Sequence, residues 1–402
     1  MLENKSIFTQ AVHAGERAEL PDYTPVSTPI YPSVGFLYED MRDLDAVFGG
    51  ERPGFVYPRY GSPTVTAFER AMAVLEGADT PEAAVAFASG MAAVHAALLG
   101  AGVRAGTSVV AAADVYGATY AVLERLMATL EVRTRFVDIT DLAEVTEAVR
   151  AERPVALLCE IISNPLMKVA DVPALAALAR DSGAALIVDN TFASPYLYRP
   201  LEHGADYVVH SATKYLGGHG DVMAGVVVCS PERALDLRER QKLLGANLGP
   251  QEAWIALRGL KTLPLRMRQH CGNALAVAQW LEGQEAIARV NYPGLASHPQ
   301  HAVARRLMGE RGFGGMLSFE LRDAGQAEVF RFMEALELVL PATTLGDVYS
   351  LTLYPAHSSH RQLAPEVRAA LGIGPGLVRL SVGIEQAEDI IADLAQALAR
   401  IG

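Results

Sequence analysis

One lysine in this chain follows an apolar, β-branched run and precedes a cluster of glycines. The segment reads Tyr207-Val-Val-His-Ser-Ala-Thr-Lys-Tyr-Leu-Gly-Gly-His-Gly220, and its lysine is Lys214. Burying an ammonium group is costly, so a lysine behind a buried strand tends to lose its proton or to find a special partner. A neutral lysine amine is a nucleophile that forms Schiff bases with carbonyl compounds. Carbonyl chemistry at Lys214 is therefore the first hypothesis.

Hydroxyl groups precede this lysine. Ser211 and Thr213, with glycine backbone nearby, are suitable hydrogen-bond donors to a phosphate. A nucleophilic lysine beside a phosphate site indicates a lysine-bound aldehyde cofactor that carries a phosphate, which is the chemistry of pyridoxal phosphate. A solvent-facing lysine at a strand end explains the same letters, because lysine is rarely buried. Both interpretations stay open on these residues alone.

A carboxylate ends another apolar run, Ile187-Val-Asp-Asn190. Asp189 placed against a pyridine nitrogen would keep that nitrogen protonated, and the cationic ring would withdraw electrons from a carbanion. Aspartate at a strand end also caps neighbouring turns, so the structural interpretation is equally open. Asp189 and Lys214 follow consecutive strand-like runs, so both side chains can reach one pocket.

Phosphate and ring contacts have further candidates in two other loops. Ala88-Ser-Gly-Met91 stands at a helix start, where the free N–H groups of Gly90 and Met91 and the helix dipole favour an anion. Ser-Gly before a helix is also ordinary N-capping. Tyr116, in Asp114-Val-Tyr-Gly117, can stack on an aromatic cofactor or simply fill a loop.

Two arginines extend the list. Arg59, close to Tyr57 in an irregular N-terminal segment, suits bidentate phosphate recognition, and such an arm can reach across a subunit boundary. Arg379, in a late strand-like run, can bind a carboxylate or lie on the surface. His357 and His360 have a metal-like spacing but neither helical context nor a third ligand nearby, so we expect no metal site.

The elements that must position these residues alternate between strand and helix patterns. The expected strands are Val109–Ala112, Arg135–Val137, Val155–Glu160, Ala184–Val188, Tyr207–Val209 and Gly225–Cys229. Such alternation predicts an α/β fold with a mostly parallel sheet covered on both faces. Ligands of these sheets sit at the carboxyl ends of the strands, where Tyr116, Asn164 and Asp189 fall.

The chain divides into three parts by pattern. We expect an N-terminal arm over residues 1–64, a cofactor domain over 65–250, and a smaller α+β domain over 251–402, with one long helical stretch from Glu252 to about Leu281. At 402 residues, the chain is long enough for such a division.

Composition restricts the class of protein. A net charge of −12 argues against sequence-independent binding to nucleic acids or anionic membranes. Three widely spaced cysteines without a CxxC pair suit a reducing compartment. The N-terminal residues show no signal peptide, and no stretch is apolar enough to span a membrane. We therefore expect a cytoplasmic protein.

With these residues in view, the chain resembles a known family, the pyridoxal-phosphate enzymes of Cys/Met metabolism of the cystathionine γ-lyase and methionine γ-lyase type. The resemblance spans nearly the whole chain. The matching blocks include Tyr57 to Thr64, Ser89-Gly-Met91, Val115-Tyr-Gly117, Ser163-Asn-Pro165, Val188-Asp-Asn-Thr191, Ser211-Ala-Thr-Lys-Tyr215, Leu257-Arg-Gly-Leu-Lys-Thr262 and Val378-Arg-Leu-Ser-Val-Gly-Ile-Glu385.

The resemblance implies a fold and an assembly. The fold is the α/β, PLP-dependent transferase fold type I, with a mostly parallel central sheet, helices on both faces and a smaller α+β C-terminal domain. The assembly is a homotetramer, a dimer of dimers, in which the arm of one subunit completes its neighbour's active site.

The resemblance also implies roles, residue by residue. Lys214 would hold pyridoxal 5'-phosphate covalently and act as the base, Asp189 would pair with the pyridine nitrogen, and Tyr116 would stack on the ring and protonate the leaving group. The implied phosphate ligands are Gly90, Met91, Ser211 and Thr213, with Tyr57 and Arg59 from the neighbouring subunit. Asn164, Thr344 and Arg379 would bind the substrate.

The implied activity is carbon–sulfur bond cleavage in a sulfur amino acid. We expect a γ-lyase that converts L-cystathionine or L-methionine into 2-oxobutanoate, ammonia and a thiol. The alternative is γ-replacement on an activated homoserine, as in cystathionine γ-synthase or O-acylhomoserine sulfhydrylase. Cystathionine-handling relatives commonly have Glu where this chain has Thr343, which favours an apolar substrate tail. Methionine γ-lyases usually have Cys where this chain has Ala118, which leaves the substrate open.

Overall fold

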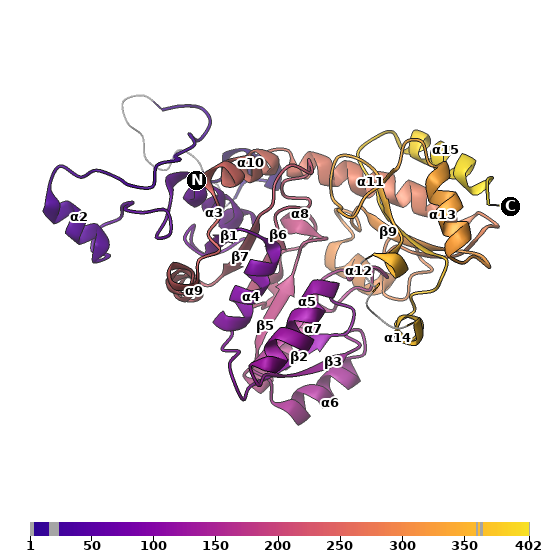
Figure 1. Ribbon diagram of the computed structural model, residues 1–402, viewed down its shortest axis with the longest axis horizontal. Helices are drawn as coiled ribbons and strands as arrows, with labels where there is room; N and C mark the ends of the chain where they lie inside the picture. The colour runs from indigo at the N-terminus through magenta and orange to yellow at the C-terminus, as the bar shows by residue number, and fades with distance from the viewer. Residues whose placement is uncertain (1–3, 16–23, 359–360, 362–364, 402) are drawn as a thin grey trace.

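The protein is described by a computed structural model over residues 4–15, 24–358, 361 and 365–401. Along its long axis lie an N-terminal arm carrying α2, a central unit around a large sheet, and a C-terminal unit around a smaller sheet (Figure 1). His360, one of the two histidines with metal-like spacing, lies outside the described residues.

The central sheet has seven strands within the described residues, in the order β1-β7-β6-β5-β4-β2-β3. Neighbours from β6 to β3 run parallel, whereas β7 is antiparallel to both β1 and β6. The strands are β1 (Ala84–Phe87), β2 (Ser108–Ala112), β3 (Arg133–Val137), β4 (Ala156–Glu160), β5 (Ala185–Asp189), β6 (Tyr207–Ser211) and β7 (Gly225–Cys229).

The smaller sheet, counted over the same part of the chain, has five strands in the order β10-β11-β12-β9-β8. Its neighbours are antiparallel except for β10 and β11. The strands are β8 (Ile287–Asn291), β9 (Met316–Leu321), β10 (Leu340–Pro341), β11 (Leu351–Leu353) and β12 (Leu377–Ser381).

Helices surround both sheets. The arm and the central unit contain α1 (Ile7–His13), α2 (Met41–Phe48), α3 (Pro63–Leu75), α4 (Gly90–Gly100), α5 (Gly117–Ala121), the π-helical η1 (Val122–Met127), α6 (Leu142–Glu152), α7 (Val172–Ser182), α8 (Ser194–Leu197), the short η2 (Pro200–His203), α9 (Pro231–Leu244) and α10 (Pro250–Leu260). The C-terminal unit contains α11 (Leu263–Glu282), α12 (His301–Met308), α13 (Gln326–Ala335), the short η3 (Pro355–His357), α14 (Pro365–Ala370) and α15 (Ala387–Leu398).

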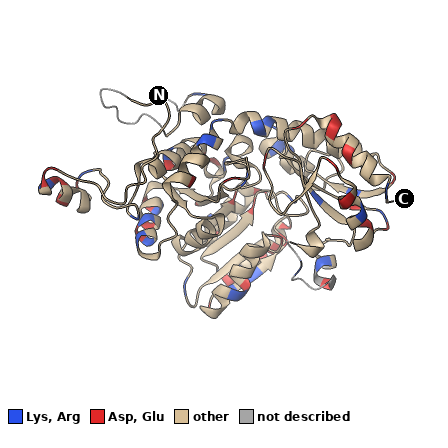
Figure 2. Cartoon of the chain, turned by 45° about the horizontal axis from the view of Figure 1, so that its top comes forward, with Lys and Arg blue, Asp and Glu red and all other residues tan. Residues whose placement is uncertain are grey.

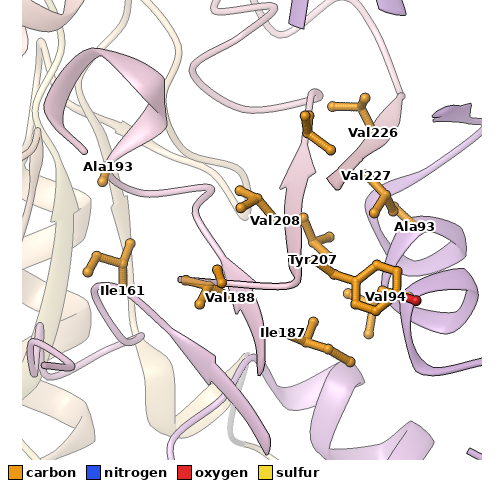
Figure 3. Packing of buried hydrophobic residues seen from close by; sticks show 14 of the residues in the cluster. Ala93, Val94, Ile161, Ile187, Val188, Ala193, Tyr207, Val208, Val226 and Val227 are labelled. Carbon is orange, nitrogen blue, oxygen red and sulfur yellow. The ribbon is translucent and has the colours of Figure 1, made fainter. Parts of the chain in front are cut away.

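The central strands are apolar on both faces because helices cover both. Val94 of α4 packs near Tyr207 on one face, while Val188 and Val208, which pair across the sheet, point to the other (Figure 3). On that second face, Glu76 at the end of α3 meets His210 of β6 at 2.5 Å. Burial on both faces explains why these strands read as continuous apolar runs.

The predicted fold class is confirmed: a mostly parallel sheet lies between helices, and a smaller α+β unit follows. The one long helix expected from Glu252 to Leu281 is wrong, because the chain forms α10 and α11 there. Pro264 stands in the first turn of α11. Its ring lacks an N–H and would clash with a carbonyl of a preceding turn, so the helix must restart. Strand β1 was not predicted.

Charged residues lie mostly on the outer helices, where Lys and Arg are interspersed with Asp and Glu (Figure 2). Among the helices that the structure describes, none has the length and apolar character that crossing a membrane requires. The predicted boundary after residue 250 falls at the first residue of α10, and the buried residues of α10 pack in the core of the central unit.

Candidate active site

A cavity of about 230 Å³ lies at the carboxyl ends of β4, β5 and β6, with one wall contributed by the C-terminal unit. It brings together nine of the predicted site residues from distant parts of the sequence. They are Gly90, Met91, Tyr116, Asn164, Asp189, Ser211, Thr213, Lys214 and Arg379. The parallel strand order explains this convergence, since parallel strands end at one edge of the sheet.

Lys214 lies in the turn after β6 and is largely buried. Its Nζ donates to Oγ1 of Thr344 at 3.1 Å, and within the described ranges it forms no ion pair. Burial, and then the positive charge of Arg379, lower the pKa of Lys214, whereas the charge of Asp347 acts in the opposite direction. The amine therefore loses its proton more readily than an ordinary lysine, as a nucleophile or base requires.

Two carboxyl groups form the floor of the cavity. Asp189 and Glu160 end neighbouring parallel strands and pair in register, so their side chains point to the same face. Asp189 Oδ1 accepts from the N–H of Thr191 at 2.9 Å, and Glu160 Oε1 accepts from the N–H of Tyr116 at 2.5 Å. Burial raises the pKa of both groups.

Glu160 was missed as a site residue from the sequence. Its signal was present, because it ends the apolar run Ala156–Glu160 in the same way that Asp189 ends Ala185–Asp189. Thr191, which also lines the cavity, was missed as well. Its role is visible only in three dimensions, since its Oγ1 accepts from the N–H of Ser211 on the neighbouring strand at 2.9 Å.

The N-terminus of α4 opens into the cavity. Ser89 caps this helix, and its Oγ accepts from the N–H of Ala92 at 3.1 Å. The first N–H groups of a helix have no acceptor in a preceding turn, so those of Gly90 and Met91 are available to an anion. The helix start lies against β6, because a Cβ added at Gly90 would lie 2.7 Å from Cβ of Ser211. Only glycine permits this approach.

Two hydroxyl residues, Ser211 at the end of β6 and Thr213 shortly after it, also line the cavity. Thr213 Oγ1 accepts from the N–H of Ala224 at 3.1 Å, which orients its side chain. Tyr116 precedes α5 and lines the opposite part of the cavity, with 46% of its surface exposed. Its ring is therefore free to contact a bound molecule.

Arg379 supplies a buried cation to the wall formed by the C-terminal unit. Its Nη1 donates to Oδ1 of Asn164 at 3.3 Å, and its Nη2 donates to the carbonyl of Thr344 at 3.1 Å. Its Nε has no partner, and among the described residues no carboxylate pairs with it. Burial lowers its pKa to about 10. A buried guanidinium without an acid is an incomplete pair that a ligand carboxylate would complete.

The remaining wall is largely apolar. Ile162, Phe192, Met223 and Leu345 line it together with the neutral hydroxyl of Thr343. Thr344 stays a predicted substrate ligand, and in this structure its hydroxyl accepts from Lys214 and its carbonyl accepts from Arg379.

Tyr57 and Arg59 lie outside this cavity in the single chain. They belong to the segment between α2 and α3, and Arg59 lies against the end of α9. Arg59 Nη1 donates to the carbonyl of Lys242 at 2.6 Å, and its guanidinium lies 5.5 Å from the centroid of the Tyr57 ring. Tyr57 is 45% exposed, so it is available to a further chain.

Comparisons with known proteins agree over nearly the full length. A family model described as "Cys/Met metabolism PLP-dependent enzyme" matches residues 8–399. An L-methionine gamma-lyase of Fusobacterium nucleatum subsp. polymorphum is 42% identical over 396 residues, covering 98% of each chain. An O-succinylhomoserine sulfhydrylase of Pseudomonas aeruginosa is 40% identical over 403 residues, covering 100% of this chain and 97% of that relative. The crystal structure of cystathionine gamma-lyase from Lactobacillus plantarum complexed with L-serine superposes with a TM-score of 0.90 at 35% identity, covering 98% and 99% of the two chains.

The residues present fit pyridoxal 5'-phosphate. The cavity combines a buried lysine that forms no ion pair with the described acids, a helix N-terminus that glycine holds against a serine, and a buried carboxylate on the floor. These are the groups that an aldehyde, a phosphate and a pyridine nitrogen need.

Proposed function

Because the chain belongs to the family of Cys/Met metabolism PLP-dependent enzymes, we propose that it is a carbon–sulfur γ-lyase. The proposed reaction converts a sulfur amino acid, L-methionine or L-cystathionine, into 2-oxobutanoate, ammonia and a thiol. Three relatives that are 40–42% identical bear the name L-methionine gamma-lyase, which supports the proposal.

One observation supports this proposal beyond family membership. Arg379, whose guanidinium pairs with no carboxylate among the described residues, lines the same cavity as Lys214. An α-amino acid offers a carboxylate to the guanidinium, and its Cα then lies between that anchor and the lysine. A bidentate pair with arginine fixes orientation as well as position. Asn164, already bonded to Arg379 at 3.3 Å, holds the guanidinium in place.

We assign the cofactor ligands as follows. Lys214 would hold the aldehyde, Asp189 would pair with the pyridine nitrogen, and Tyr116 would contact the ring. The phosphate ligands are the N–H groups of Gly90 and Met91 and the hydroxyls of Ser211 and Thr213. These residues all line one cavity, which supports the assignment.

The proposed chemistry uses few groups of the chain. When bound, the cofactor supplies an electron sink for negative charge at Cα. Arg379 binds the substrate carboxylate, and the amine of Lys214, its pKa lowered by burial, removes the proton from Cα as general base. After passing that proton on, the same amine removes a proton from Cβ, and the electron pair of that C–H bond expels the sulfur from Cγ. Tyr116 donates a proton to the leaving sulfur, and water then releases 2-oxobutanoate and ammonia. The C-terminal unit contributes one wall of the cavity through Thr343, Leu345 and Arg379.

The apolar wall favours a substrate with an uncharged tail. Thr343 is neutral, and Phe192, Met223 and Leu345 offer no charge to a distal ammonium group. Leaving such an ammonium unpaired would cost binding energy, whereas a thioether methyl group packs on these side chains. L-methionine is therefore the first substrate to test, and L-cystathionine the second.

The second candidate is γ-replacement on an activated homoserine. The sulfhydrylase relative from Pseudomonas aeruginosa, with its 40% identity over the whole chain, favours it. The lyase and synthase reactions use the same residues until the γ-substituent leaves. They differ in whether a thiol then enters, so the cavity alone leaves both reactions available.

One experiment separates these reactions. Purified enzyme is incubated with L-methionine, with L-cystathionine, or with O-acyl-homoserine plus cysteine, and 2-oxobutanoate, pyruvate, thiol and new thioether are measured. Release of 2-oxobutanoate and a thiol from L-methionine supports the proposal. If a thioether forms from O-acyl-homoserine and cysteine, and L-methionine and L-cystathionine yield no 2-oxobutanoate, the activity is γ-replacement instead. Pyruvate from cystathionine reveals β-elimination.

We further propose a cytoplasmic homotetramer, built as a dimer of dimers from chains divided into residues 1–64, 65–250 and 251–402. The extended arm supports this arrangement, because Tyr57 and Arg59 lie away from the cavity of their own chain and remain exposed. In the assembly, these two residues would reach the phosphate end of a neighbouring cavity.

A further inference from the structure

Glu160 is the one acidic side chain besides Asp189 among the residues that line the cavity. It is the last residue of β4 and only 7% exposed. Because Glu160 pairs in register with Asp189 on β5, the two carboxyl groups leave the sheet side by side.

The carboxyl of Glu160 joins two loops that carry other site residues. Its Oε1 accepts from the N–H of Tyr116 at 2.5 Å, in the loop between β2 and α5. It also receives a hydrogen bond from the backbone of Asn164, in the loop after β4. Within residues 24–358, no lysine or arginine forms an ion pair with it. Its bonding is thus to backbone N–H groups, which an uncharged acid also satisfies.

The surroundings of Glu160 oppose a second negative charge on the floor. Asp189 faces it from β5 and Asp114 from the loop after β2, with the thiol of Cys159 beside it on β4. The two cations that line the cavity, Lys214 and Arg379, lie on its other walls. Burial, and then the charge of Asp189, raise the pKa of Glu160 well above its ordinary value.

Asp189 is the better placed of the two carboxyls to keep its charge. Both the hydroxyl and the N–H of Thr191 stabilise its ionised form. Two adjacent buried carboxyls share protons as a pair, so ionisation of the first opposes that of the second.

We propose that Glu160 is a positioning residue that holds Tyr116 and the Asn164 loop as an uncharged acid, leaving Asp189 as the sole anion on the floor. The oxygen that does not accept from Tyr116 keeps the proton. The ring nitrogen of a bound cofactor would then have a single negatively charged partner, Asp189. The hydrogen bond to Glu160 would fix the position of Tyr116. This inference rests on the assignment of the cavity to the cofactor, and not on which sulfur amino acid reacts.

Substitutions that separate shape from charge test this inference. Glu160→Gln keeps the length and the acceptor but is always neutral, whereas Glu160→Asp keeps the acid but is too short to reach Tyr116. The apo forms are titrated with pyridoxal 5'-phosphate, and the absorbance of the bound cofactor is recorded against pH. Glu147→Gln, on the exposed α6, is the matched control.

The inference expects Glu160→Gln to bind the cofactor within twofold of the wild type, with an unchanged absorbance titration. Glu160→Asp should bind about tenfold more weakly, because the hydrogen bond to Tyr116 is lost. If Glu160→Gln weakens cofactor binding or shifts the absorbance titration as much as Glu160→Asp does, the proposal that Glu160 is uncharged is wrong. If neither variant changes the binding, the positioning role is wrong. The melting temperature of each apo form identifies variants that misfold. If the wild type itself does not bind the cofactor, the proposal that this cavity binds pyridoxal 5'-phosphate is wrong.

Discussion

Arg379 donates from Nη1 to Oδ1 of Asn164 at 3.3 Å, although 215 positions separate these residues in the chain. Asn164 follows β4 of the large sheet, and Arg379 lies on β12 of the small one. The contact therefore joins the two units at the edge of the cavity. Any change in how the units sit against each other would move the carboxylate anchor relative to Lys214.

Replacing Lys214 should abolish cofactor attachment. Lys214→Ala removes the buried amine at the centre of the cavity, so the absorbance of a lysine-bound cofactor and the turnover should both be lost. Spectra of the purified protein after addition of pyridoxal 5'-phosphate, followed by an assay of 2-oxobutanoate, provide the measurement. Lys5→Ala, at an exposed position near the N-terminus, is the control. A Lys214→Ala protein that keeps both signals would reject the assignment.

Replacing Arg379 should impair substrate binding more than cofactor binding. Arg379→Lys keeps a positive charge but loses the fork that grips a carboxylate. We expect kcat/KM to fall by about 10²-fold, as for the loss of a hydrogen bond between charged groups, with most of the change in KM. The cofactor dissociation constant, measured by absorbance, should change little. An equal loss of both affinities would show that Arg379 supports the cavity rather than the substrate.

The protonation of Lys214 should respond to the two charges that face it. An amine must be uncharged to capture the cofactor, so the capture rate of the apo enzyme should rise with pH to a midpoint below the ordinary lysine value of 10.5. Asp347 favours the protonated form, and Asp347→Asn should therefore move the midpoint to lower pH. Arg379→Met should move it to higher pH. Stopped-flow absorbance over a pH series measures both shifts, and a rise of the midpoint in Asp347→Asn would contradict the electrostatic account.

Two glycine substitutions should have opposite effects on stability. A Cβ at Gly90 would lie 2.7 Å from Cβ of Ser211, so Gly90→Ala should destabilise the fold by about 1–3 kcal/mol and weaken cofactor binding. A Cβ at Gly272, inside α11, has no other atom within 4 Å. Gly272→Ala should therefore stabilise the fold by about 0.5–1 kcal/mol through helix propensity. Denaturant melts of the two apo variants give the comparison, and a Gly90→Ala protein as stable as the wild type would contradict the close approach.

Mixing two inactive variants tests whether the arm serves a neighbour. Arg59→Ala keeps Lys214 but lacks an arm contact, whereas Lys214→Ala keeps the arm but lacks the amine. In a mixed dimer, one cavity receives an intact lysine from the first chain and an intact arm from the second. Refolded together in equal amounts, the variants should recover about one quarter of the wild-type activity if pairing is random. If mixed oligomers form but no activity is recovered, Arg59 acts on the cavity of its own chain.

The sequence pattern was sufficient for strands β2 to β7 of the central sheet and for most of the cavity. Apolar runs between helical segments predicted β2 to β7, because parallel strands are buried on both faces and leave continuous apolar stretches in the sequence. Site residues at the ends of those runs, such as Asp189 and Lys214, then had to converge, since parallel strands end at one edge. Strand β1 escaped prediction because its four residues, Ala84–Phe87, include two alanines and carry little strand signal.

The contacts within the site depended on tertiary structure. The pairing of Glu160 with Asp189 follows from the adjacency of β4 and β5, and strand order is a long-range property that no local pattern contains. The same holds for Arg379, whose role depends on the absence of an acid beside it in the folded chain. Residue types and their spacing thus determined which chemistry this protein can perform. Only the packing of distant segments, driven by burial of their apolar faces, decided which charges meet and which remain unpaired.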